Sequence, residues 1–116
     1  MIVGIGVDSI EHERVRDAIS SPAFAARVFT PEELELPLTS ISARWAAREA
    51  AVKALGGLHG MRLRDLAVTR THLGRPVFVQ SPELDRVLAR LGVNELHLSL
   101  THDQTTSCAF VVAERH

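Results

Sequence analysis

The amino-acid sequence predicts an α+β fold in which a mainly antiparallel sheet packs with one long central helix. Short apolar or alternating segments near the two ends of the chain are typical of strands. Between them, Ser42 to Leu55 is dominated by strong helix formers and stops at Gly56-Gly57. With 116 residues, no internal repeat and no low-complexity tract, the chain is expected to form one domain, residues 1–116.

The first half of the chain is predicted to hold a strand and several helical segments. An apolar strand runs from Ile2 to Asp8, and its glycines permit close approach of another backbone. Apolar residues at helical spacing predict a helix from Ile10 to Ile19, stopped near Ser21-Pro22. Phe24 to Phe29 adds a helical turn, and Thr30-Pro31-Glu32-Glu33 has the form of a capping box, opening a short helix that Pro37 ends.

The second half is predicted to hold four strands and one helix. Residues 66–71 and 77–80 are expected to form strands around a turn at Leu73-Gly74-Arg75-Pro76. Ser81-Pro82-Glu83 opens a helix that runs to Leu91 and closes at Gly92. The alternating segment Leu96 to Thr101 is expected to pair with Ser107 to Ala113 across a polar turn.

Composition excludes several classes of protein. A formal net charge of −1 argues against a general nucleic-acid binder, which needs a basic excess. No apolar run approaches the ~20 residues that span a bilayer, and Met1-Ile2-Val3-Gly4 lacks the charged start of a signal peptide. We therefore expect a soluble cytoplasmic protein that does not bind membranes. The single cysteine, Cys108, is expected to be a buried strand thiol, and the six histidines show no zinc-ligand spacing with cysteines.

Three residues of the central helix share one stripe. Trp45, Glu49 and Lys53 follow one another at a spacing of four. A glutamate four residues before a lysine is often an ordinary surface ion pair, worth roughly 0.2–0.5 kcal/mol. The alternative is that Glu49 binds a metal and Lys53, one turn away, contacts a phosphate.

Asp8 provides the context for the second alternative, because it is a lone carboxylate at the end of the glycine-rich strand. It could cap the following helix or bind a cation, and the two roles are compatible. Two carboxylates from separate segments suit Mg²⁺, which keeps several waters and is usually completed by substrate phosphates. The substrate implied is a phosphate ester or a pyrophosphate.

Other catalytic motifs are absent from the sequence. Gly4-Ile5-Gly6-Val7-Asp8-Ser9 lacks the third glycine of a dinucleotide-binding fingerprint, and the chain contains neither a Walker A motif nor a nucleophile elbow. His102 and Asp103 follow the alternating strand, where they either stabilise a turn or contact a polar ligand.

Taken together, three segments resemble the holo-acyl-carrier-protein synthases, the short type of 4′-phosphopantetheinyl transferase. The N-terminal Gly-Ile-Gly-x-Asp and the central Glu-x-x-x-Lys are specific to these transferases in combination, and their order and spacing match across almost the whole chain. The segments are Gly4 to Asp8, Arg44 to Leu55 and His97 to His102.

The resemblance implies an enzyme that transfers 4′-phosphopantetheine from coenzyme A to a serine of an apo acyl carrier protein. The serine attacks the β-phosphorus and expels adenosine 3′,5′-bisphosphate. It further implies a homotrimer, with coenzyme A bound between neighbouring subunits. Mg²⁺ would be held by Asp8 and Glu49, and Lys53 would steady the leaving group. The implied adenosine 3′,5′-bisphosphate cradle is Arg44, Gly74, Arg75, Pro76, Thr101 and His102, and the implied carrier-protein surface is Arg14, Phe24 and Arg27.

Two features depart from the family pattern. Arg48 stands before Glu49 where the family usually has lysine, which keeps the charge but changes its shape. The link between Thr30 and Trp45 is several residues shorter than expected. Two alternative functions remain open: a Mg²⁺-dependent hydrolase of a nucleotide or pyrophosphate that uses the same three residues, and a non-catalytic carrier-binding module. The sequence does not decide whether the carrier serves fatty-acid, polyketide or peptide synthesis.

Overall fold

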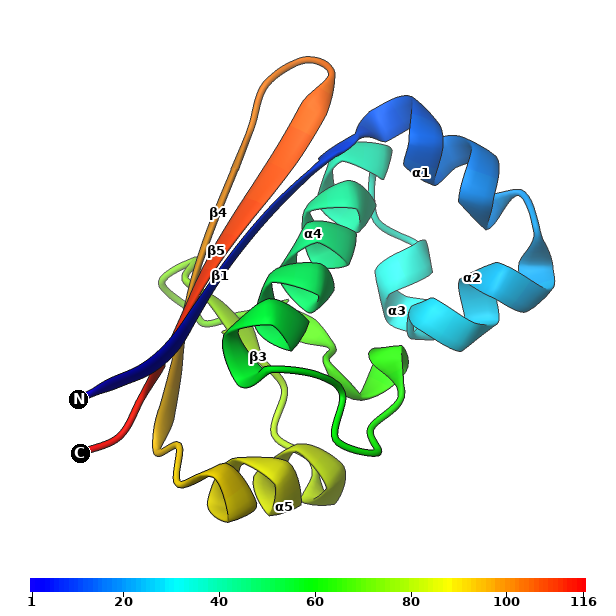
Figure 1. Ribbon diagram of the computed structural model, residues 1–116. Helices are drawn as coiled ribbons and strands as arrows, with labels where there is room; N and C mark the ends of the chain where they lie inside the picture. The colour runs from blue at the N-terminus through cyan, green and yellow to red at the C-terminus, as the bar shows by residue number, and fades with distance from the viewer.

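A three-stranded antiparallel sheet, in the order β1-β5-β4, forms one layer of the structure. Its strands are β1 (Ile2–Glu11), β4 (Glu95–His102) and β5 (Thr106–Glu114). The structure is a computed structural model that describes residues 1–116. Figure 1 shows α4 (Leu38–Leu55) lying across one face of this sheet, with the two ends of the chain side by side. This arrangement confirms the predicted α+β class.

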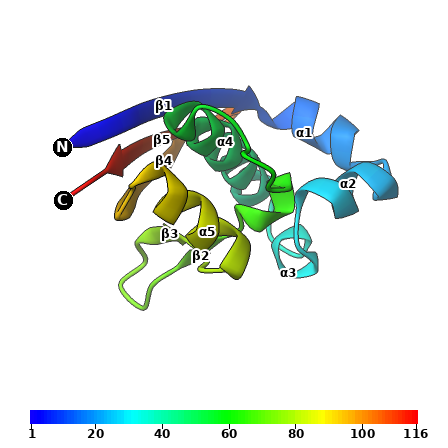
Figure 2. The same ribbon diagram turned by 60° about the horizontal axis from the view of Figure 1, so that its bottom comes forward.

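The remaining elements surround α4. Figure 2 shows α1, α2 and α3 at one end of the molecule and the β2–β3 hairpin at the β4 side, away from α1. No helix combines the length and the apolar composition that a membrane crossing requires. The bounds of these elements are α1 (His12–Ile19), α2 (Pro22–Val28), α3 (Pro31–Leu34), a 3₁₀ turn η1 (Leu63–Asp65), β2 (Val68–Arg70), β3 (Pro76–Phe78) and α5 (Pro82–Leu91).

Small residues bring α4 and β1 into close contact. The buried face of α4 is rich in alanine, including Ala46, Ala47, Ala50 and Ala51, all fully buried. A Cβ atom at Gly6 would overlap the carbonyl oxygen of Ala50. The glycines of the N-terminal motif are therefore required by packing, as the predicted close approach of backbones implies.

Several predicted boundaries were wrong. The first strand continues to Glu11 rather than ending at Asp8, because Ser9, Ile10 and Glu11 pair with β5, and α1 starts at His12. The central helix begins at Leu38 rather than Ser42, since the carbonyl of Pro37 accepts bonds from the N–H groups of residues 40 and 41. The β2–β3 strands are also shorter than predicted.

Local capping signals were predicted correctly. Thr30 Oγ1 accepts from the N–H of Glu33 at 3.3 Å, and Glu33 Oε1 accepts from the N–H of Thr30 at 2.9 Å, which is the reciprocal capping box. Ser81 caps α5, and Gly92 ends it in the left-handed conformation with φ 72°. Cys108 is half-buried rather than buried, because it lies on the face of β5 that α4 does not cover.

A buried ion pair joins α3 to α4. Arg48 donates to both carboxylate oxygens of Glu33, at 2.7 and 3.1 Å, and its Nε donates to the carbonyl of Leu63 at 2.8 Å. The N–H of Val68 also donates to Glu33, at 3.1 Å, and the guanidinium lies 5.1 Å from the centre of the Phe29 ring. This bidentate and stacked arrangement gives the departure from lysine at position 48 a structural role.

Candidate active site

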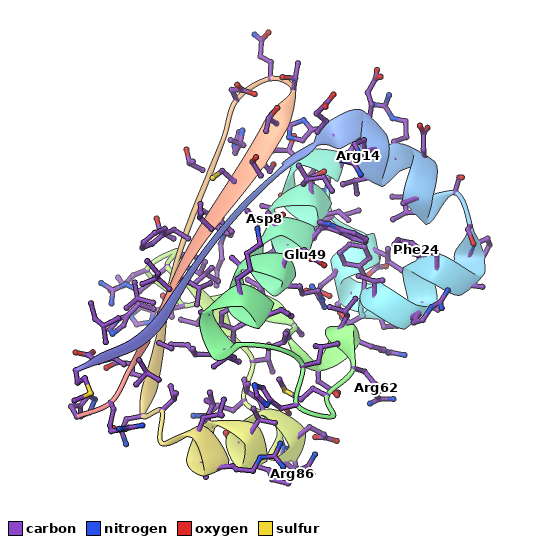
Figure 3. The ribbon with its side chains drawn as sticks, in the orientation of Figure 1. Asp8, Arg14, Phe24, Glu49, Arg62 and Arg86 are labelled. Carbon is purple, nitrogen blue, oxygen red and sulfur yellow. The ribbon has the colours of Figure 1, made fainter.

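Asp8, Glu49 and Lys53 lie together between β1 and α4. Side chains alternate between the two faces of a strand. Asp8 therefore points to the same face of β1 as Gly6 and Ile10, which is the face that α4 covers. Lys53 Nζ donates to the carbonyl oxygen of Val7 at 2.9 Å and to Asp8 Oδ1 at 3.3 Å. Figure 3 shows Asp8 and Glu49 as neighbours on this side of the helix.

The charges of this group are not balanced. Burial and the neighbouring charge of Asp8 raise the pKa of Glu49, and Lys53 offsets this only in part. Lys53 pairs with Asp8 rather than with Glu49, so the ordinary ion pair within the helix is not what the structure contains. Asp8 does not cap α1 either, because Glu11 occupies the N-cap position. Two converging carboxylates with surplus negative charge have the chemistry of a divalent-cation site.

An aromatic cluster lies one helical turn from Glu49. The Phe24 ring of α2 packs against Trp45 at 5.2 Å between ring centres, and Arg14 of α1 lines a cavity of about 160 Å³ with Trp45. Arg27 is exposed near the end of α2. Two of the residues predicted to receive the carrier protein, Arg14 and Phe24, therefore border this cluster. Sequence reasoning gave Trp45 no role, although its spacing of four from Glu49 was a usable signal.

The predicted nucleotide cradle lies elsewhere in the chain. Gly74 adopts a positive φ of 83° in the β2–β3 turn, and Arg75 and Pro76 line a depression of about 310 Å³ against β4. Arg44 is buried, with Nε 3.4 Å from the carbonyl of Val68 and Nη1 3.1 Å from that of Ser40. Burial is the main cause that lowers the pKa of Arg44.

Thr101 and His102 are exposed at the end of β4. Thr101 pairs with Cys108, so its side chain lies on the sheet face away from α4. Asp8 lies on the face that α4 covers, and β5 separates its strand, β1, from β4. His102 Nδ1 is 3.3 Å from the carbonyl of Asp103, whose side chain accepts the N–H groups of Thr105 and Thr106 in the turn. One chain thus brings together Asp8, Glu49 and Lys53 but does not bring the predicted cradle to them.

Comparison with known proteins gives the family. The model of the 4′-phosphopantetheinyl transferase superfamily matches residues 4–111. A holo-acyl-carrier-protein synthase of Clavibacter sepedonicus is 44% identical, over 98% of this chain and 97% of that protein. The crystal structure of the Neisseria meningitidis synthase is similar with a TM-score of 0.86 and 36% identity, covering 99% of this chain and 100% of that one. The Bacillus anthracis synthase, solved in complex with coenzyme A (3′,5′-ADP), has a TM-score of 0.79 and 29% identity, covering 100% and 99%.

The chain belongs to the 4′-phosphopantetheinyl transferase superfamily. Within it, the chain is an enzyme of the holo-acyl-carrier-protein synthase type, which moves 4′-phosphopantetheine from coenzyme A to apo acyl carrier protein.

Proposed function

We propose that this transferase depends on Mg²⁺ and that Asp8 and Glu49 hold the ion together with the pyrophosphate of coenzyme A. The observation that supports the proposal is the convergence of two carboxylates, one with a raised pKa, beside a single lysine. Burial and, after it, repulsion from Asp8 raise the pKa of Glu49, and a divalent cation would remove the repulsion. Two carboxylates that supply hard oxygen ligands suit Mg²⁺, which keeps several waters.

In the proposed reaction, the carrier serine oxygen forms a bond to the β-phosphorus and loses its hydroxyl proton to solvent, and the bond from that phosphorus to adenosine 3′,5′-bisphosphate breaks. Mg²⁺ held by Asp8 and Glu49 would neutralise charge on the pyrophosphate. Lys53 is positioned by the carbonyl of Val7 and by Asp8, and its ammonium steadies the leaving phosphate.

We further propose that a neighbouring copy supplies the adenosine 3′,5′-bisphosphate cradle. Apart from Arg44 of α4, its residues lie on β4 or on the β2–β3 hairpin beside β4, while Asp8 is on β1, so a shared site between copies accounts for their separation. The cradle residues are Arg44, Gly74, Arg75, Pro76, Thr101 and His102. Because Arg44 is buried against Val68, its proposed role is to hold the β2–β3 hairpin in place for Arg75.

A homotrimer is the proposed assembly. The sheet face that α4 leaves uncovered carries Ile5, Val7 and Phe110, which are 60%, 53% and 44% exposed. A contiguous exposed apolar surface of this kind favours association of copies of the chain. Homo-oligomers commonly have closed cyclic symmetry. Three copies packed through this face would bring the β1 side of one copy toward the β4 side of the next.

The docking surface for the carrier protein is proposed to be Arg14, Phe24 and Arg27. Arg14 and Arg27 are exposed and basic, and Phe24 presents a half-buried ring beside Trp45. Phe24 and Arg14 lie beside Trp45, one helical turn from Glu49, where the carrier serine must arrive. An acidic carrier helix is the partner that this surface fits.

Intact mass spectrometry of an apo carrier protein, after incubation with coenzyme A, Mg²⁺ and this protein, tests the function. We expect the mass of one phosphopantetheine group to be added, and no addition in a chelator. A hydrolase would release adenosine 3′,5′-bisphosphate without carrier, and a non-catalytic module would bind carrier and leave its mass unchanged.

A further inference from the structure

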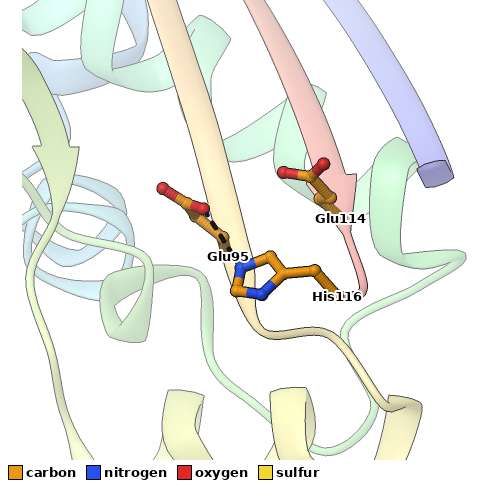
Figure 4. A group of neighbouring side chains, drawn as sticks. All are labelled: Glu95, Glu114 and His116. Atoms are coloured by element: carbon orange, nitrogen blue, oxygen red, sulfur yellow. Dashed lines mark ion pairs between the residues drawn. The ribbon is translucent and has the colours of Figure 1, made fainter. Parts of the chain in front are cut away.

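Two glutamates and two histidines gather at the end of the sheet far from Asp8. Glu95 of β4 and Glu114 of β5 are direct cross-strand partners, and His97 lies two residues further along the same face of β4. His97 Nε2 is 2.9 Å from Glu114 Oε1 and 3.7 Å from Glu95 Oε1, and His116 Nε2 is 3.4 Å from Glu95 Oε1. Figure 4 shows Glu95, Glu114 and His116 converging from β4, β5 and the C-terminal tail.

The separations of these atoms fit one metal ion. Single ligand atoms of Glu95, Glu114 and His116 all lie within 4.8 Å of one another. In a tetrahedral site with bonds of about 2.0–2.1 Å, neighbouring ligand atoms are about 3.3 Å apart. The contact of His116 with Glu95, at 3.4 Å, matches that value, and the contacts of His97 with Glu114 and Glu95, at 2.9 and 3.7 Å, lie on either side of it.

The backbone holds these ligands in place. The β4–β5 register fixes Glu95, His97 and Glu114 on one sheet face. The tail is tied to α5, because Arg115 Nε donates to the carbonyl of Gly92 at 2.9 Å, and the N–H of His116 donates to Asn94 Oδ1 at 2.6 Å. Like charges directly across a strand pair are destabilising, and here His97 and His116 lie against the opposed glutamates and share with them the position that a cation would take.

We propose that Glu95, Glu114 and His116, with His97 as the fourth ligand, bind a divalent transition-metal ion of the zinc type. Two imidazoles with two carboxylates suit Zn²⁺ better than Mg²⁺ or Ca²⁺, which prefer oxygen ligands alone. The proposed site adjoins the nucleotide cradle, because Glu95 and His97 line the same depression as Arg75 and Pro76, but it is separate from the Asp8–Glu49 group. Glu114 pairs with Ile2 at one end of β1, whereas Asp8 lies near the other end and pairs with Ala109.

Metal titration of the full chain tests the site. Zn²⁺ is added against a chromophoric chelator in excess Mg²⁺, which keeps the Asp8–Glu49 region occupied by the harder ion. We expect one Zn²⁺ per chain, with His116→Ala and His97→Ala each weakening it about tenfold or more. His72→Ala is the matched control, because His72 is exposed in the β2–β3 turn without an acidic partner, and it should bind as the unmodified chain does.

Co²⁺ supplies a readout of coordination itself. Co²⁺ at the site should give the visible absorption of a tetrahedral ion, and His116→Ala should lose it. Zn²⁺ should also raise the melting temperature of the unmodified chain but not that of His116→Ala. Absence of this absorption, or equal Zn²⁺ affinity in His116→Ala, His97→Ala and His72→Ala, would overturn the proposal.

Discussion

At the residue scale, the proposed chemistry depends on two carboxylates that repel each other. Asp8 and Glu49 share one nearby cation, Lys53 Nζ, which is 3.3 Å from Asp8. Each carboxylate supplies oxygen that a methyl group cannot, so Asp8→Ala and Glu49→Ala should each lower transferase kcat/KM by about a hundredfold or more. Steady-state kinetics at saturating Mg²⁺ measure the loss. Glu35→Ala removes an exposed carboxylate elsewhere and is the control. Full activity in either variant would refute the ligand assignment.

The buried pair of Glu33 and Arg48 gives a pH-dependent stability. Burial by itself would raise the pKa of Glu33, but the hydrogen bond and charge of Arg48 and the N–H groups of Thr30 and Val68 together lower it. The folded state therefore favours the carboxylate. Its stabilisation is complete above the ordinary value of 4.5 and is lost as pH falls through the lowered pKa of the folded protein.

Removing one partner of this pair leaves the other buried without compensation. Glu33→Gln should reduce the free energy of unfolding by about 3–5 kcal/mol at neutral pH. Because the variant cannot lose that contribution on acidification, its stability should depend less on pH below 4.5, the ordinary pKa. Urea unfolding at a series of pH values measures both effects. Parallel pH profiles for the two proteins would contradict the assignment.

Single residues also show what sequence could and could not predict. The Thr30–Glu33 capping box was predictable because both partners lie within one turn. The pairing of Arg48 with Glu33 and of Lys53 with Asp8 was not, because the partners come from separate elements and helical spacing pointed Lys53 to Glu49. The residue types of the candidate site were therefore available from the sequence, but their contacts were not.

At the scale of elements, the separation of β1 and α4 sets the distance between Asp8 and Glu49. Gly6 faces the backbone of α4, and a Cβ there would overlap the carbonyl of Ala50. Gly6→Ala should therefore force the strand away from the helix, lowering the free energy of unfolding by about 1–3 kcal/mol or more and reducing activity. Thermal melts and kinetics test this. Ser9→Ala, on the opposite face of β1, is the control and should change neither.

A further prediction concerns docking of the carrier protein on the surface formed by α1 and α2. Exposed charges are screened within about 10 Å at 0.1 M salt, so added salt should raise the KM for carrier and leave that for coenzyme A nearly unchanged. Arg14→Glu and Arg27→Glu should weaken carrier binding in the same selective way. Phe24→Ala should weaken it with little added salt sensitivity, because an apolar anchor contributes buried area. Equal effects on the two KM values would place docking elsewhere.

Element boundaries explain the errors of the sequence prediction. Helical spacing of apolar residues suggested a helix from Ile10, but pairing of residues 9–11 with β5 keeps them extended. Strand pairing across the length of the chain is a tertiary effect that no local pattern contains. The α5 helix, with Ser81 and Gly92 as local signals at its ends, was predicted closely.

At the scale of the whole molecule, the proposed homotrimer predicts complementation. Asp8 lies on β1 and His102 on β4, the two outer strands of the sheet, so a site shared between copies takes one residue from each. Asp8→Ala and His102→Ala chains should each be weakly active alone and should regain part of the activity after mixing under conditions of subunit exchange. Light scattering should give a trimer for both. A fully active monomer, or no recovery in trimers shown to be mixed, would contradict the shared site.

The opposite orientation of Asp8 and Thr101 on the sheet also affects kinetics on dilution. Under the proposed assembly, separation of the copies divides every site. When the enzyme is diluted below a threshold concentration, its specific activity would then fall. The activity would return with second-order kinetics when the enzyme is concentrated again. The rate of carrier-protein phosphopantetheinylation in a cell would therefore rise more steeply than linearly with the amount of this protein.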